Sequence, residues 1–243
     1  MTKDLRVNAD RMLASFNQLA LIGATAEGGV HRLTFSEAHL TARKWFREEI
    51  ARSSLEFKTD GAGNHSAFLA TAGRVAPHDS GGVYRDQTLL LGSHLDSVPN
   101  GGRFDGALGV IAALEVLRTI KESEINLKVN LEAIDFTDEE GTLVGLLGSA
   151  AIAGHFHPEM LQSPRGGREN LVEGMQRAGL SDEDMLGAPE RIICGIFGIA
   201  HRTRQTTRAR RNQHWHRLCD CWDLVVSAVV HRARRPRGLN HNG

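Results

Sequence analysis

One segment of the sequence constrains the fold more than any other. A continuous apolar run over residues 88–92 is typical of a strand that is buried on both faces. Residues 107–121 then carry apolar side chains at helical spacing, and residues 127–134 alternate between polar and apolar. Strand, loop, helix and strand in this order predict a layered α/β fold, in which a crossover helix joins two parallel strands.

The flanking sequence predicts further elements. Thr34 and Glu37 form a capping-box pattern, so a helix is expected to open there and to continue to about Arg52. The other expected elements are a helix over 8–22, short strands over 55–57 and 66–70, a turn at 60–64, a polar loop over 76–86, a short helix over 146–154 and weak helices beyond 158.

Charge divides the chain into two unlike parts. Residues 1–190 hold 18 basic and 27 acidic side chains, whereas residues 191–243 hold 11 arginines, no lysine and two acids. All three cysteines lie in the second part, and an odd number does not indicate a disulfide framework. Neither a secretory leader nor an apolar run long enough to span a membrane is visible. We therefore expect a cytoplasmic protein without a membrane partner.

Residues 190–243 are expected to form a poorly packed basic tail. One alternative is that its arginines bind nucleic acid, but no recognisable fold pattern surrounds them. Another is a zinc site, because the tail contains imidazole and thiol ligands, although their spacing is not that of a known finger. These ligands are His214, His216, Cys219 and Cys221. We expect no nucleic-acid partner.

Imidazole and carboxylate groups gather where the expected strands end. His94 and Asp96 directly follow one strand, Asp105 precedes the crossover helix, and Glu139 and Glu140 follow the next strand. Ligands of open α/β sheets bind outside the carboxyl ends of the strands, so all five side chains can converge on one crevice. Zinc accepts both ligand types, and two metal ions together can clamp the oxygens of a hydrolytic displacement.

Four nearby titratable residues are not expected to bind metal. Asp135 and Asp138 are expected to be surface or turn residues. His155 and His157 could substitute for a missing ligand, but a solvated helix end is the expected place for both.

Three motifs resemble those of one enzyme family. Residues 92–106 read Gly-Ser-His-Leu-Asp-Ser-Val-Pro-Asn-Gly-Gly-Arg-Phe-Asp-Gly, residues 136–141 read Phe-Thr-Asp-Glu-Glu-Gly, and residues 147–149 read Leu-Gly-Ser. Together they resemble the N-carbamoyl-L-amino-acid hydrolase and allantoate amidohydrolase family, within the dinuclear-zinc aminoacylase and carboxypeptidase superfamily. The resemblance covers roughly residues 8–189.

The resemblance implies a role for each candidate residue. His94 would bind one metal ion, Asp105 would bridge two, and Glu140 would bind the other. Glu139 would be the general base, and Asp96 would hold His94 in place. The implied cofactors are two divalent ions, zinc first, with manganese, cobalt or nickel as alternatives. The implied reaction is hydrolysis of a linear amide or ureido C–N bond in a small molecule, either an N-carbamoyl-L-amino acid or an allantoate-like ureide.

Part of the family pattern is not found. Relatives supply two more metal-binding histidines, one of them in a His-Ile-Glu-Gln-Gly motif, and an inserted lid and dimerisation domain through which they form homodimers. We therefore expect residues 1–189 to form a partial three-layer zinc-exopeptidase-like catalytic domain without the lid and dimerisation domain. Little or no activity is expected of such a chain. The alternative is a non-catalytic interaction protein with a basic tail.

The genetic code offers a reason for the change near residue 190. One permitted set of codons for residues 190–205, read one base later, encodes Leu-Glu-Leu-His-Ile-Glu-Gln-Gly. We therefore expect the reading frame to slip near residues 189–191, which would make residues 190–243 an out-of-frame translation.

Overall fold

The fold is built on a five-stranded mixed sheet. The computed structural model describes residues 5–70, 88–125, 127, 129–188 and 193–198. The strands are β1 (Glu56–Thr59), β2 (His65–Leu69), β3 (Thr88–His94), β4 (Asn130–Phe136) and β5 (Ile193–Gly198), in the order β1-β2-β4-β3-β5. β2 pairs antiparallel with β1 and with β4, whereas β3 pairs parallel with β4 and with β5. The three parallel strands therefore end at a common edge of the sheet.

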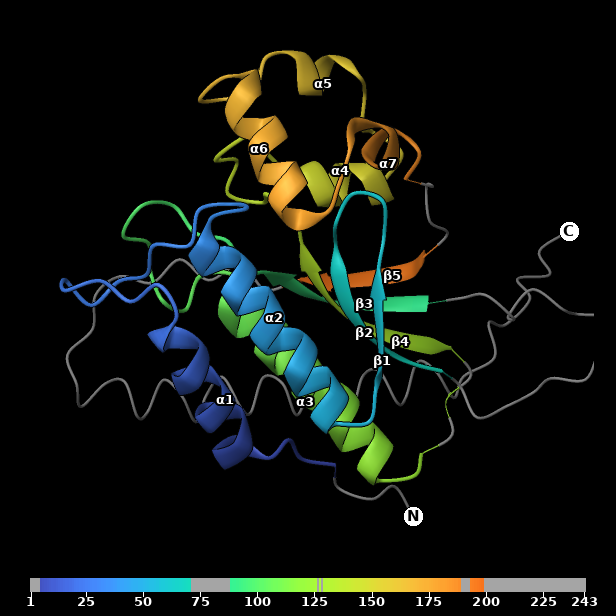
Figure 1. The fold of residues 1–243 in the computed structure, drawn as a ribbon. Helices are drawn as coiled ribbons and strands as arrows, with labels where there is room; N and C mark the ends of the chain where they lie inside the picture. The colour runs from blue at the N-terminus through green and yellow to red at the C-terminus, as the bar shows by residue number, and fades with distance from the viewer. Residues whose placement is uncertain (1–4, 71–87, 126, 128, 189–192, 199–243) are drawn as a thin grey trace, which may run out of the picture.

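Three helices cover one face of this sheet (Figure 1). They are α1 (Ala9–Leu21), α2 (Glu37–Arg52) and α3 (Ala107–Glu122). All but the last two residues of α3 are buried, as expected of a helix that lies between a sheet and another helix. Leu89 and Leu91 of β3 join the core under these helices, whereas Leu90 packs with Ile134 on the opposite face.

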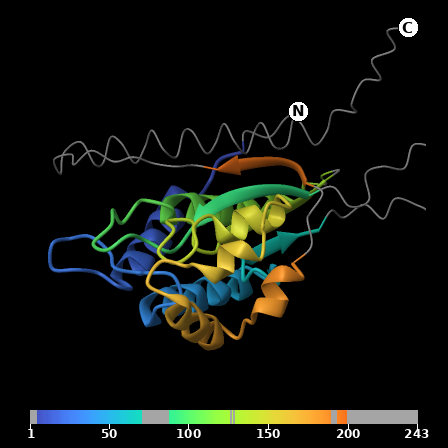
Figure 2. The ribbon, with the colours of Figure 1, turned by 90° about the horizontal axis from the view of Figure 1, so that it is seen from above.

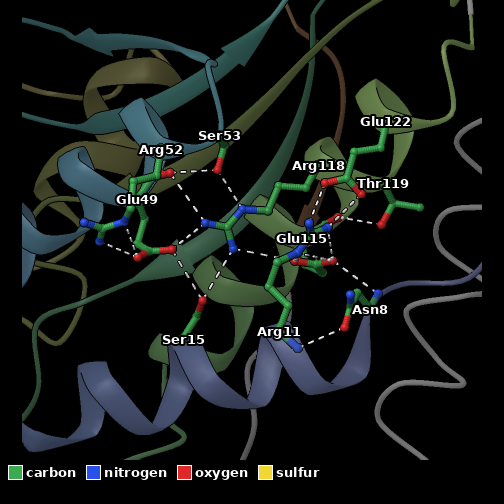
Figure 3. Close-up of polar contacts among 10 residues, drawn as sticks. All are labelled: Asn8, Arg11, Ser15, Glu49, Arg52, Ser53, Glu115, Arg118, Thr119 and Glu122. Carbon is green, nitrogen blue, oxygen red and sulfur yellow. Dashed lines mark hydrogen bonds and ion pairs between the residues drawn. The ribbon is translucent and has the colours of Figure 1, made fainter.

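A network of ion pairs ties the three helices together (Figure 3). Arg118 on α3 pairs with Glu49 on α2, and its Nε donates to Ser53 Oγ over 2.7 Å. Arg11 on α1 pairs with Glu115 over 2.7 Å and with Glu122, both on α3. Arg52 also pairs with Glu49. We call these residues the helix-layer network: Arg11, Glu49, Arg52, Glu115, Arg118 and Glu122.

Four short helices gather beyond the end of β4 (Figure 1). They are α4 (Leu147–Ile152), α5 (Glu159–Gln162), α6 (Arg168–Ala178) and α7 (Asp182–Leu186). Phe35, Leu147, Leu171 and Met175 are fully or almost fully buried in a small apolar cluster that joins these helices to the start of α2. This second cluster covers the loops at the end of β4.

Most expected elements are confirmed, with one correction at the start of α2. Ser36, not Thr34, is the N-cap, and its side chain accepts a hydrogen bond from His39 N. The Thr34 hydroxyl lies instead within hydrogen-bond distance of Asp96 and Asp138. Sequence pattern alone could not separate these two hydroxyls, because they are two residues apart and either could precede the helix.

Strand β5 was not predicted from the sequence. It lies at the edge of the sheet beside β3, as Figure 2 also shows, so the sheet extends past the expected boundary at residue 190. The expected loop over 76–86 and the tail from residue 199 onward lie outside the described residues. Within the described part, none of the helices combines the length and apolar character needed to cross a membrane.

Candidate metal centre

Three of the five candidate side chains converge at the common edge of the parallel strands. His94, Asp105 and Glu140 each place one ligand atom within 4.8 Å of the other two. His94 is buried, whereas Asp105 and Glu140 are partly exposed. The group thus lies at the surface end of the sheet, where a small molecule can reach it.

The topology explains this convergence. β3 and β4 pair in parallel with His94 opposite Phe136, so the residues that follow each strand leave the sheet at the same edge. Asp105 enters from the loop before α3. The next residue, Gly106, has φ of 63°, and a Cβ there would lie 2.5 Å from the imidazole of His94. Glycine is therefore required for the chain to pass this close to the ring.

Asp96 holds the imidazole of His94 from the side of Nδ1. Asp96 is fully buried, its carbonyl oxygen lies 3.0 Å from Nδ1, and its Oδ1 lies 3.4 Å from the same nitrogen. Its Oδ2 accepts a hydrogen bond from Glu140 N over 3.1 Å. These contacts leave Nε2 of His94 as the nitrogen that can bind a metal ion, with the proton on Nδ1.

Glu139 is held by a serine from the Leu-Gly-Ser motif. Ser149 on α4 donates a hydrogen bond to Glu139 Oε2 over 2.9 Å. Burial raises the pKa of Glu139, although this hydrogen bond opposes the shift. A carboxylate with a raised pKa is better suited to accept a proton near neutral pH than an ordinary glutamate.

The candidate centre carries an excess of negative charge. Burial raises the pKa of Glu140, and the neighbouring carboxylates of Asp105, Asp96 and Glu139 raise it further against the effect of His94. Burial lowers the pKa of His94, but hydrogen bonding to Asp96 and its charge outweigh burial and bring that pKa to about 9. Such mutual repulsion among carboxylates is relieved when a cation binds between them.

Two predictions about neighbouring acids were wrong in part. Asp135 and Asp138 were expected at the surface or in turns, yet both are fully buried. Asp138 does lie in the turn after β4, with φ of 55°, and it accepts hydrogen bonds from Val144 N and Gly145 N. Burial raises the pKa of Asp135, and Arg43 opposes this shift.

The remaining histidine predictions have different outcomes. His155 and His157 are exposed just after α4, as expected of a solvated helix end. The tail residues His214, His216, Cys219 and Cys221 lie outside the described residues, so the prediction that they bind no zinc stays a prediction.

The residues present fit a divalent metal ion. One imidazole nitrogen and two carboxylate oxygens are ligand types that zinc accepts. Asp96 Oδ1 is buried beside Nδ1 of His94 and has no hydrogen-bond partner in the described part of the chain. A carboxylate in this place is the usual support for a metal-binding histidine.

Comparison with known proteins identifies relatives of this chain. The family model described as Peptidase family M28 matches residues 73–164. The chain is 37% identical over 183 residues to an N-carbamoyl-L-amino acid amidohydrolase of Geobacillus stearothermophilus, covering 74% of this chain and 42% of that protein. It is 35% identical over 188 residues to an allantoate amidohydrolase of Bacillus subtilis, covering 76% of this chain and 40% of that protein.

Solved structures that resemble this chain include amidases of a similar kind. A hydantoinase/carbamoylase family amidase from Burkholderia ambifaria superposes with a TM-score of 0.70 at 28% identity, covering 86% of this chain and 48% of the other. The chain thus spans about two fifths of the length of the curated relatives named above. Over the matched three quarters of its length, the chain belongs to the family of N-carbamoyl-L-amino-acid and allantoate amidohydrolases.

Proposed function

We propose that this chain provides the metal-binding edge of an amidohydrolase that cleaves a linear amide or ureido C–N bond. The observation that carries the proposal is the convergence of His94, Asp105 and Glu140 at the end of the parallel strands. The substrate class follows from the relatives, which are amidohydrolases of N-carbamoyl-L-amino acids and of allantoate.

Three residues of the chain would hold the metal. His94 and Glu140 would each bind one of two divalent ions, preferably zinc, and Asp105 would lie between the ions. When bound, such ions polarise a carbonyl group and lower the pKa of a coordinated water. Three side-chain ligands are few for two ions, so we expect weak occupancy at the second position.

Glu139 is the residue proposed to move the proton. Its partial burial and its hydrogen bond from Ser149 hold the carboxylate beside the ligand group. In this role it removes a proton from the attacking water and delivers it to the departing nitrogen. Asp96 keeps His94 in a single orientation through Nδ1.

The overall reaction consumes one water. Hydrolysis of an N-carbamoyl-L-amino acid would release the free amino acid, ammonia and carbon dioxide. We expect a small-molecule substrate, a cytoplasmic location, and neither a nucleic-acid nor a membrane partner. Homodimer formation is expected from the resemblance to the family.

The proposal is tested by metal content and turnover measured on the same samples. Zinc bound per folded chain is measured after dialysis, and ammonia release is followed with an N-carbamoyl-L-amino acid and with allantoate. We expect zinc to be retained and turnover to be slow. Glu139→Gln should keep the zinc and lose the turnover, whereas His94→Ala should lose both.

A matched control separates these effects from a general loss of charge. Glu159→Gln on α5 changes an exposed glutamate and should leave both readings unchanged. A wild-type chain that retains no divalent metal would contradict the proposal. In that case the alternative of a non-catalytic protein with a basic tail would be favoured.

We also propose that the reading frame slips near residues 189–191, so that residues 190–243 are an out-of-frame translation. β5 runs parallel to β3 and ends at Gly198, so the chain leaves the sheet at the edge that carries His94. If the codons of this segment are read one base later, the histidine of the His-Ile-Glu-Gln-Gly motif falls two residues beyond this strand. The nucleotide sequence of the gene tests this proposal directly.

A further inference from the structure

Two oppositely charged side chains are buried directly behind the candidate metal centre. Asp135 on β4 is fully buried, and Arg43 on α2 is 2% exposed. Arg43 Nε donates a hydrogen bond to Asp135 Oδ2 over 2.8 Å. Burying such a pair is costly, and an apolar pair of similar volume is often at least as stable. The ion pair therefore needs an explanation other than stability.

The second oxygen of Asp135 contacts the turn that presents the imidazole. Leu95 N donates to Asp135 Oδ1 over 2.7 Å, and Leu95 is the residue between His94 and Asp96. β3 ends at His94, so this peptide lies just beyond the strand. The carboxylate of Asp135 thus sets the direction in which the chain leaves the strand.

The other two donors of Arg43 reach the turn between β1 and β2 and the turn after β4. Nη1 donates to Gly63 O and Nη2 donates to Thr137 Oγ1, each over 2.9 Å. Thr137 is the first residue after β4 and lies two residues before Glu139. A single guanidinium therefore contacts the start of this turn directly and the turn after β3 through Asp135.

We propose that Arg43 and Asp135 form a positioning pair that holds the turns after β3 and β4 in the relative arrangement that metal binding requires. The proposal rests on the proposed metal-binding function and adds two residues that do not touch the metal. Arginine suits this role because its planar group presents donors in fixed, different directions. A lysine at the same place could not hold both turns in this way.

Two double variants test the role of the acceptor beside Leu95. Arg43→Met with Asp135→Leu removes both charges and the acceptor, whereas Arg43→Met with Asp135→Asn removes both charges but keeps an acceptor oxygen. The readouts are the zinc affinity of the folded protein, the absorption spectrum of bound Co²⁺, and the melting temperature in chelator.

We expect the leucine variant to bind zinc about 10- to 100-fold more weakly, which is the usual effect of losing a support of a metal ligand. Its Co²⁺ spectrum should change as well. The asparagine variant should bind zinc more tightly than the leucine variant, because it keeps the acceptor for Leu95 N, but more weakly than wild type, because it lacks Arg43. An asparagine variant that binds as tightly as wild type would overturn the role of Arg43. Equal affinity in the two variants would overturn the proposal, whether both are strong or both are weak.

If the double variants do not fold, Asp135→Glu tests whether Asp135 positions the turn at Leu95. It keeps the charge and the pair with Arg43 but moves the acceptor away from Leu95 N by one methylene. We expect weaker zinc binding in a protein that still unfolds cooperatively in chelator, and unchanged affinity would overturn the proposal. Failure of the wild type to bind zinc is a separate result, because it would remove the proposed function itself.

Discussion

The helix-layer network and the candidate metal centre are both rich in charge, but they are organised in opposite ways. In the network each glutamate pairs with at least one arginine, and Glu115 and Arg118 are buried together (Figure 3). In the metal centre Asp105 and Glu140 lie beside His94, the charge of Asp105 raises the pKa of Glu140, and neither acid forms an ion pair with an arginine among the described residues. One cluster is nearly neutral, whereas the other is strongly negative.

The pKa shifts of the acids reflect this difference. Burial raises the pKa of Glu49, but hydrogen bonds from Arg118 and Arg52 outweigh burial and lower that pKa overall. Hydrogen bonding to Arg11 lowers the pKa of Glu122. Burial raises the pKa of both Glu139 and Glu140. Paired acids thus stabilise the fold, whereas the unpaired acids cost stability until a cation binds.

A cavity of about 350 Å³ lies beside the helix-layer network, but its lining does not indicate a binding site. Its charged lining residues include Arg11, Glu49, Arg118 and Glu122, which are already paired with one another. Comparison of the two regions therefore shows that uncompensated charge, rather than charge density or cavity size, marks the candidate functional site.

The largest effect is expected from breaking the buried pair in the network. Arg118→Met leaves Glu49 without its buried partner and should destabilise the protein by about 3–5 kcal/mol. Denaturant unfolding measures this loss. Arg52→Met is the control, because Arg52 is 56% exposed and its pair with Glu49 should contribute less than about 1 kcal/mol. If both variants lose the same amount of stability, burial does not make the pair of Arg118 with Glu49 stronger than the exposed pair of Arg52 with Glu49.

Zinc should stabilise the protein by binding at the candidate metal centre. At a free zinc concentration of 100 times Kd, ligand linkage predicts a gain of about 2.7 kcal/mol. Thermal unfolding with and without zinc measures it. His94→Ala should abolish the gain, and it should also lower stability in chelator, because it removes the imidazole that pairs with the buried carboxylate of Asp96. A gain that survives this substitution would place the metal elsewhere in the chain.

Acid should weaken the network through Glu49. Its folded-state pKa lies below the ordinary value of 4.5, so its contribution is complete above about that pH and is lost as pH falls through the folded pKa. Glu49→Gln should cost about 1.5–3 kcal/mol at pH 7. It should also flatten the decline in stability between pH 5 and pH 3. An unchanged acid profile would refute the pairing.

The smallest effect is expected from neutralising a ligand in the metal-free protein. Glu140→Gln removes a carboxylate that its neighbours already repel, so stability in chelator should stay the same or rise by less than about 1 kcal/mol. The same variant should lose the zinc-dependent gain. A clear loss of stability in chelator would show that Glu140 has a structural partner, and the contrast between the two regions would then fail.

Much of the fold could be predicted because its signals are local. The apolar run at the start of β3, the helical spacing in α3 and the alternation in β4 each depend on neighbours in the sequence. The residues of the candidate metal centre could also be named, because all five adjoin these elements. β5 could not be predicted, since its place beside β3 depends on pairing between distant segments.

By itself, the sequence determined the order of the helices and central strands and the side chains available for metal binding, because apolar spacing and strand-end position are local properties. Only the tertiary structure decided that Asp135 is buried against Arg43, that Thr34 faces Asp96 and Asp138 instead of capping α2, and that Ser149 holds Glu139. Apart from Ser149 and Glu139, these partners lie more than sixty residues apart. Their contacts therefore arise only when the sheet and its covering helices bring distant segments together and exclude water.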